Sequence, residues 1–158
     1  MARYNRWANE RLYAACGQLP AGECHKPRQA FFGSIHGTLC HVLVGDRLWL
    51  ARIAGEPPPD LRLDDRPYAT LEELGAARAA EDRRIIDLLD ATAEEALPDL
   101  VRYRTVVRPE AVETPLHLCW SHMFNHQTHH RGQAHDQLSQ TVVPPPSLDL
   151  IYYLREHE

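Results

Sequence analysis

Apolar and polar residues follow a helical period along four long stretches of this chain. Within each stretch, apolar side chains recur at intervals of three and four residues, which places them on one face of a helix. The stretches cover residues 4–16, 34–54, 70–91 and 114–138. A shorter stretch of the same kind, SLDLIYYLREH, begins at Ser147. The pattern predicts an all-α protein, an antiparallel four-helix bundle followed by a short C-terminal helix.

Residues at the ends of the stretches support these boundaries. Thr70 and Glu73 have the spacing of a capping box at the start of the third helix. Thr114 followed by Pro115 is typical of an N-cap and a first helical position, and predicts the start of the fourth. The segment LVRYRTVVRP (100–109) is rich in β-branched residues and alternates in part. It predicts either a short hairpin or an extended linker.

Length, charge and composition narrow the class of protein. The chain has 158 residues, which suits a single domain over residues 1–158, and its formal net charge is −5. Binding to nucleic acid without sequence preference normally requires a basic surface. The chain has no long run of Lys or Arg, so a nucleic-acid partner is not expected. The chain has no apolar run of ~20 residues and no signal-peptide core, so we expect no membrane partner and a cytoplasmic location. The four cysteines form no C-x-x-C pair and are expected to be buried free thiols.

Histidines gather in one segment, around the stretch NHQTHHRGQ. On a helical wheel at ~100° per residue, the apolar residues of this segment centre about 80° from His126. His130 lies inside the apolar sector and His126 lies on its edge, whereas His117 and His135 lie far from it. Two imidazoles four residues apart on one helix face can reach one metal ion. His126 and His130 are therefore candidate metal ligands.

A third ligand is expected from a facing helix, because a catalytic metal site usually has about three protein ligands and an open position. The second stretch offers His36 and His41, which lie roughly 140° apart on its wheel. Small residues share the side of His41: Ser34, Gly37, Thr38 and Gly45. They leave room for an ion, or they allow close helix packing. We predict His41 as the third ligand; the alternative is that these histidines are surface residues or core residues bonded to the backbone.

Other residues are candidates for the surroundings of this site. The expected pocket or supporting residues are His122, His129, Gln133, Asn5, Asn9 and Trp49. For each of them, bridging between helices or core packing is an alternative role. Asp46 and Arg131 form a candidate ion pair between two helices, without a functional role.

Four stretches of the chain resemble the DinB family, the damage-inducible group of the DinB/YfiT-like metalloproteins. They are YNRWANERL, GTLCHVLVGDRLWLAR, HMFNHQTHHRGQAHDQLSQ and DLIYYLRE. The resemblance implies an up-down-down-up four-helix bundle, often a homodimer, with one divalent metal held by three histidines. Carried onto this sequence, they are His41, His126 and His130. The resemblance leaves nickel, zinc and iron open as the metal, and related branches are transferases or isomerases that depend on small thiols.

The donor set determines which chemistry is expected. Three neutral imidazoles leave a divalent ion its full charge and open positions, so it can lower the pKa of a bound water or hold a thiol as thiolate. A metalloprotease of the H-E-x-x-H type is not expected, because Gln127 stands in place of the Glu. We favour an S-transferase that joins a low-molecular-weight thiol to a small electrophile. A metal-hydroxide hydrolase, a non-catalytic metal-binding stress or damage-response protein and a metal-free helical dimer are the alternatives.

Overall fold

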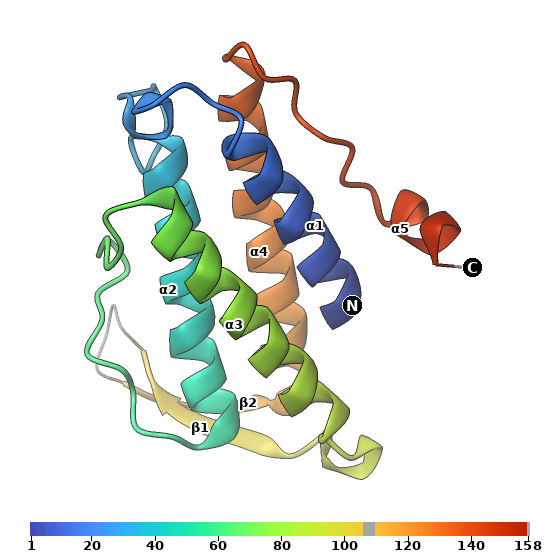
Figure 1. Ribbon diagram of the computed structural model, residues 1–158. Helices are drawn as coiled ribbons and strands as arrows, with labels where there is room; N and C mark the ends of the chain where they lie inside the picture. Colours follow the sequence, from blue (N-terminus) through green and yellow to red (C-terminus); the bar gives the residue numbers. More distant parts are fainter. Residues whose placement is uncertain (106–109, 158) are drawn as a thin grey trace.

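The computed structural model describes residues 1–105 and 110–157, and in this part of the chain four long helices lie side by side (Figure 1). The long helices are α1 (Ala2–Cys16), α2 (Ile35–Ala54), α3 (Leu71–Asp90) and α4 (Leu116–Ser139). A short helix, α5 (Leu150–Glu156), follows, and two single turns of 3₁₀ helix occupy Glu23–His25 and Glu94–Ala96. The periodicity therefore predicted the long helices correctly, and the C-terminal helix begins three residues later than expected.

The helices pack in a closed ring of contacts. α2 lies against α3 and α4, and α1 completes the ring by contacting the same two helices. In Figure 1, α1 and α4 run in one direction, and α2 and α3 run in the opposite one. The long connection of residues 55–70 returns the chain between α2 and α3, which lets these neighbours run parallel.

The core has two apolar clusters with a polar layer between them. One cluster contains Leu12, Ile35, Leu43, Leu74 and Leu138, and the other contains Leu50, Ile85, Trp120 and Met123. Between them along the helices lies the buried polar layer, which consists of Asn5, Asn9, Asp46, Arg78, Asp82, Gln127 and Arg131. Most buried polar groups in proteins are paired, and here the contacts of Asp46 with Arg78 and of Asn9 with Asp82 link α1, α2 and α3 across this layer.

The capping box predicted at the start of α3 is present, whereas the predicted start of α4 is not. The Thr70 hydroxyl accepts from the Glu73 amide and the Glu73 carboxylate accepts from the Thr70 amide, which completes the capping box. Ser34 caps α2 by accepting from the Gly37 amide at 3.0 Å. The N-cap predicted at Thr114 is wrong: α4 begins at Leu116 after Pro115, without a side-chain cap.

A small antiparallel sheet explains that error and corrects the all-α prediction. Strand β1 (Leu100–Arg104) pairs with β2 (Ala111–Pro115), with Leu100 opposite Pro115 and Arg104 opposite Ala111. Thr114 belongs to β2, opposite Val101, so its backbone is committed to the strand ladder. Of the segment 100–109, the first half is β1, as the hairpin alternative predicts, and residues 106–109 lie outside the described residues.

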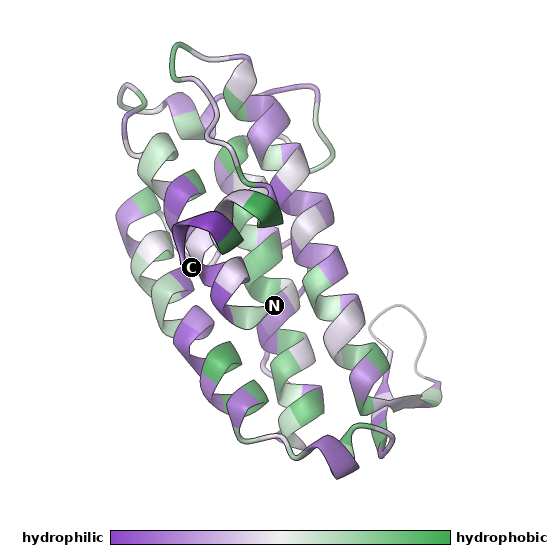
Figure 2. Ribbon diagram, turned by 90° about the vertical axis from the view of Figure 1, so that its right-hand side faces the viewer, coloured by the Kyte–Doolittle hydropathy of each residue, from purple (hydrophilic) through white to green (hydrophobic). Residues whose placement is uncertain are grey.

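The helices carry both hydrophilic and hydrophobic residues, and the cysteines lie in the interior. Hydrophilic and hydrophobic residues mix along every long helix in Figure 2. Among the described residues, no helix combines the length and the apolar character needed to cross a bilayer. All four cysteines are free and buried, as predicted.

Candidate metal centre

The structure brings His41 of α2 together with His126 and His130 of α4. One ring nitrogen from each lies within 4.8 Å of the others. The Nε2 atoms of His41 and His126 are 3.2 Å apart, and the His130 ring lies 4.5 Å from the His41 ring and 4.3 Å from the His126 ring. Three imidazoles at such distances form a cluster that is compatible with binding of a single metal ion.

Hydrogen bonds fix which nitrogen of two rings faces the cluster. His41 Nδ1 donates to the Leu63 carbonyl at 2.9 Å, and His130 Nδ1 donates to Gln133 Oε1 at 2.8 Å. Carbonyl oxygens only accept, so both hydrogens lie on Nδ1 and both Nε2 atoms present a lone pair. Such a second hydrogen bond is typical of histidines that bind metals. The Nδ1 atom of His126 is buried and has no partner among the described residues.

Burial keeps the three rings uncharged. Loss of water lowers the pKa of His126 to about 3, and the nearby rings of His130 and His41 add to this effect. Burial also lowers the pKa of His41 and of His130. At neutral pH all three are therefore neutral, which is the form of imidazole that coordinates metals. The two facing lone pairs and the three neutral rings together fit a divalent cation.

Two residues outside the predicted set shape this cluster. A Cβ atom at Gly45 would lie 2.8 Å from Cε1 of His126, so the glycine admits the imidazole. The room beside His41 that the small residues suggested is therefore partly filled by the His126 ring. Phe32 stacks on His41 with a centroid distance of 3.9 Å and meets His130 edge-on at 5.4 Å. It lies in the loop between the 3₁₀ turn Glu23–His25 and α2, where helical periodicity gives no signal.

We expect Gly45→Ala to reduce metal affinity at least tenfold without unfolding the protein. Alanine is favoured over glycine in a helix by about 1 kcal/mol, which supports the backbone of α2. The added methyl group, however, displaces the His126 ring, and sub-ångström errors in ligand position are costly. Competition with a chromophoric chelator measures the affinity, and circular dichroism measures the helix content.

Gly132→Ala is the matched control for this change. Gly132 lies on the exposed side of α4, and a Cβ atom there meets nothing within 4 Å. This variant should keep the metal affinity of the wild type. Equal affinities of the Gly45 and Gly132 variants would contradict the placement of His126 against α2.

The other predicted residues divide into three groups. Gln133 holds His130 and also contacts the exposed His129, with 3.3 Å between Gln133 Nε2 and His129 Nε2. His122 and Trp49 lie against each other, with ring centroids 4.5 Å apart, and both line a cavity beside the cluster. Asn5 and Asn9 bond instead within the buried polar layer.

The ion pair expected between Asp46 and Arg131 is replaced by other contacts. Asp46 pairs with Arg78 of α3. Arg131 donates to the side-chain oxygens of Asn5 at 2.6 Å and Asn9 at 3.2 Å. The prediction was wrong because α3 places a cation nearer to Asp46, and because two amide oxygens of α1 occupy the Arg131 donors.

The cavity beside the cluster, which we name the inner cavity, has a volume of about 310 Å³. Its lining residues are His41, Gly45, Leu48, Trp49, Arg52, Leu63, Tyr103, Thr105, His122 and His126. No carboxylate of the described residues is among them. A larger outer cavity of about 820 Å³ shares Leu48, Arg52, Tyr103 and Thr105 with it. The two together lead from the histidines to the hairpin and the loop after α2.

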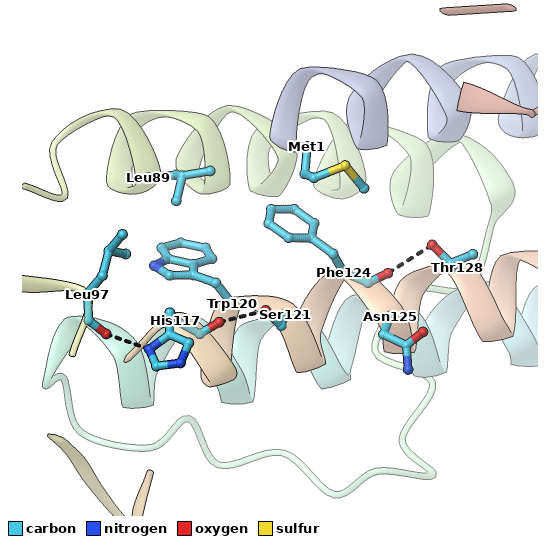
Figure 3. A pocket seen from close by; sticks show the side chains of 9 residues that line it. All are labelled: Met1, Leu89, Leu97, His117, Trp120, Ser121, Phe124, Asn125 and Thr128. Atoms are coloured by element: carbon cyan, nitrogen blue, oxygen red, sulfur yellow. Dashed lines mark hydrogen bonds between the residues drawn. The ribbon is translucent and has the colours of Figure 1, made fainter. Parts of the chain in front are cut away.

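A separate apolar groove lies on another face, between the start of α1, the end of α3 and α4 (Figure 3). Leu89, Trp120 and Phe124 give it an apolar wall. Both of its hydroxyl groups are engaged: Ser121 Oγ donates to the His117 carbonyl at 2.7 Å, and Thr128 Oγ1 donates to the Phe124 carbonyl at 2.9 Å. The groove therefore offers contact area rather than reactive groups.

The chain is similar to known proteins over nearly its whole length. A sequence model described as the DinB family matches residues 1–158. The chain is also similar to Protein DinB of Bacillus subtilis (strain 168), with 27% identity over 160 residues. That alignment covers 96% of this chain and 90% of the Bacillus protein. The match spans α2 and α4, which carry the three histidines, and the chain belongs to the DinB family.

Proposed function

We propose that this DinB family member is a divalent-metal protein that forms one up-down-down-up four-helix bundle over residues 1–158. His41, His126 and His130 would hold a nickel, zinc or iron ion through their Nε2 atoms. The observation that carries the proposal is the convergence of three neutral imidazoles, two of them oriented by hydrogen bonds on Nδ1. A neutral donor set leaves the charge of the ion available for chemistry.

The reaction that this site supports best is transfer of a small thiol to an electrophile. A divalent ion with open positions lowers the pKa of a bound thiol, and the thiolate is the nucleophile. In such a step a sulfur–carbon bond forms, the leaving group departs with its electron pair, and the thiol proton passes to solvent. The chain supplies the neutral ligands and the aromatic walls of Trp49 and Tyr103.

Hydrolysis is less well supported, because it needs a base for the attacking water. Among the described residues, no carboxylate lines the inner cavity. Gln127, which occupies the position of the metalloprotease glutamate, points into the buried polar layer, where Asn9 Nδ2 approaches its Oε1 at 3.4 Å. An amide cannot take up a proton at neutral pH. The side chains around the cluster therefore favour a nucleophile that the metal itself can activate.

Metal analysis and a thiol assay test the proposal. The untagged protein, purified without a nickel column, should contain about one divalent ion per chain by mass spectrometry. It should accelerate the reaction of cysteine, cysteamine or glutathione with monobromobimane. Bound metal without turnover would instead assign a non-catalytic metal-binding role in a stress response. Absence of metal after incubation with zinc, nickel and iron(II) would overturn the proposal.

The proposal includes a homodimer in which a second copy of the chain covers the apolar groove. Met1, Leu89 and the Trp120–Phe124 pair, whose rings stack at 6.0 Å, give the groove its apolar character. Burial of such a surface favours association in water. Sedimentation of the purified protein reports the mass of the assembly.

A further inference from the structure

Arg52 occupies the junction between the inner and outer cavities. It lies near the end of α2, and its guanidinium carbon lies 4.6 Å from the centre of the Trp49 ring and 4.7 Å from that of Tyr103. Helix α2 and strand β1, which carry these aromatic residues, are in contact (Figure 1). Two flanking rings hold a guanidinium in place and leave its edge, with the N–H donors, open to the cavities.

No carboxylate among the described residues pairs with Arg52. One of its five N–H donors reaches the Arg104 carbonyl at 3.4 Å. The two acidic residues of the outer cavity are already paired: Glu56 with Arg84 at 2.5 Å, and Glu113 with Arg102 at 2.6 Å. A half-buried cation that retains free donors inside a cavity is a ready site for an anion.

The inner cavity is suited to a ligand with negative charge at both ends. His41 and His122 line it, and no carboxylate of the described residues does. Arg52 provides positive charge at the outer end, and a metal ion on the three histidines would provide it at the inner end. His41 and Arg52 lie on the same face of α2, and both side chains line the inner cavity.

We propose that Arg52 binds a carboxylate of the thiol substrate. This inference rests on the proposed function, since it takes the sulfur to lie at the three histidines. Arg52 would determine specificity, because its planar fork matches a carboxylate in a bidentate contact. The aromatic rings of Trp49 and Tyr103 would then pack along the middle of the ligand.

Glutathione and glutathione diethyl ester are matched probes for this proposal. They share the thiol, the amine and the length, and the ester lacks both carboxylate charges. Isothermal titration of the zinc-loaded protein should show at least tenfold tighter binding of glutathione than of the ester. In Arg52→Gln this preference should fall to about one, with zinc content unchanged. Arg52→Lys keeps the charge without the planar fork and should show an intermediate preference.

Arg83→Gln is the control, since Arg83 is an exposed arginine on α3, and it should retain the full preference. Equal binding of the two probes to the wild type, no binding of either, or a preference that persists in Arg52→Gln would overturn the inference. If the wild type takes up no zinc, the proposed function fails, and the same titration on the metal-free protein still decides the role of Arg52. If zinc binds normally and the preference is absent, only the inference about Arg52 fails.

Discussion

His126→Ala is expected to lower zinc affinity by more than about 100-fold while the helical fold persists. Loss of an outer hydrogen-bond partner of a metal ligand already costs about 10–100-fold, and loss of a ligand costs more. His126 contacts both other members of the cluster, since its ring centroid lies 5.1 Å from that of His41 and 4.3 Å from that of His130. Apart from the 3.2 Å contact between its Nε2 and that of His41, its side chain makes no hydrogen bond within the described chain. Removal of the ring should therefore affect the site before the fold.

His129→Ala is the matched control for this variant. His129 follows three residues later on the same helix, is exposed, and contacts Gln133 rather than the cluster centre. It should keep zinc affinity within a few-fold of the wild type. Chelator competition gives both affinities, and circular dichroism gives helix content. A His126 variant that binds zinc as the wild type does would remove the three-histidine site from consideration.

Arg78→Met should destabilise the protein by about 3–5 kcal/mol, the usual cost of removing one partner of a buried ion pair. Arg78 is 3% exposed and Asp46 is fully buried. Burial works to lower the pKa of Arg78, but Asp46 and Asp82 outweigh it, so the guanidinium stays charged. Without Arg78, the carboxylates of Asp46 and Asp82 remain buried in the core. The groups of α1 that face Asp82 are the neutral side-chain amides of Asn5 and Asn9.

The loss should depend on pH in a defined direction. Burial raises the pKa of Asp46 to about 7 even though Arg78 opposes the shift, and removal of Arg78 raises this pKa further. A carboxyl whose pKa is higher in the folded state than in the unfolded state favours folding when protonated. Its contribution is lost as pH rises through the folded-state value. Urea unfolding should therefore show a smaller defect for Arg78→Met at pH 5 than at pH 8.

Arg62→Met provides the surface comparison. Arg62 pairs with Asp64 at 3.2 Å, but both side chains are largely exposed, so no measurable loss is expected. Arg78→Met should bind zinc with wild-type affinity once folded, because Arg78 does not touch the histidines. A stability change as small as that of Arg62→Met would show that the buried polar layer does not hold the helices together.

Local patterns predicted the helices and the histidine cluster, because both depend on spacing within one helix. His126 and His130 are separated by about one turn, and a wheel of α4 alone sets them apart from His117 and His135. The prediction that His41 joins His126 and His130 required only that α2 lie against α4. Such a contact is common between helices of a small bundle. Distances within a helix are fixed by its geometry, so such predictions survive folding.

Features that depend on contacts between distant segments were not predictable in this way. Thr114 is of a residue type that is favoured at N-caps, but in the structure it pairs with Val101 in the sheet. The sequence pattern around Val101 predicted either a hairpin or a linker, so this pairing could not be anticipated. Asp46 has Arg78 as its partner because of the rotation of α3, which spacing does not fix. Phe32 and the Leu63 carbonyl reach His41 from loops, where side-chain period carries no information.

The walls of the inner cavity come from two different parts of the fold. The metal ligands come from α2 and α4, whereas Tyr103 and Thr105, at the far wall, come from β1 and the residue after it. This hairpin lies between α3 and α4 in sequence. Neither Tyr103 nor Thr105 belongs to one of the two apolar clusters of the core. Changes there can remodel the entrance while the helices and their histidines stay in place. A lineage with this architecture can acquire new substrates by exchanging one short surface segment, without having to evolve the metal site again.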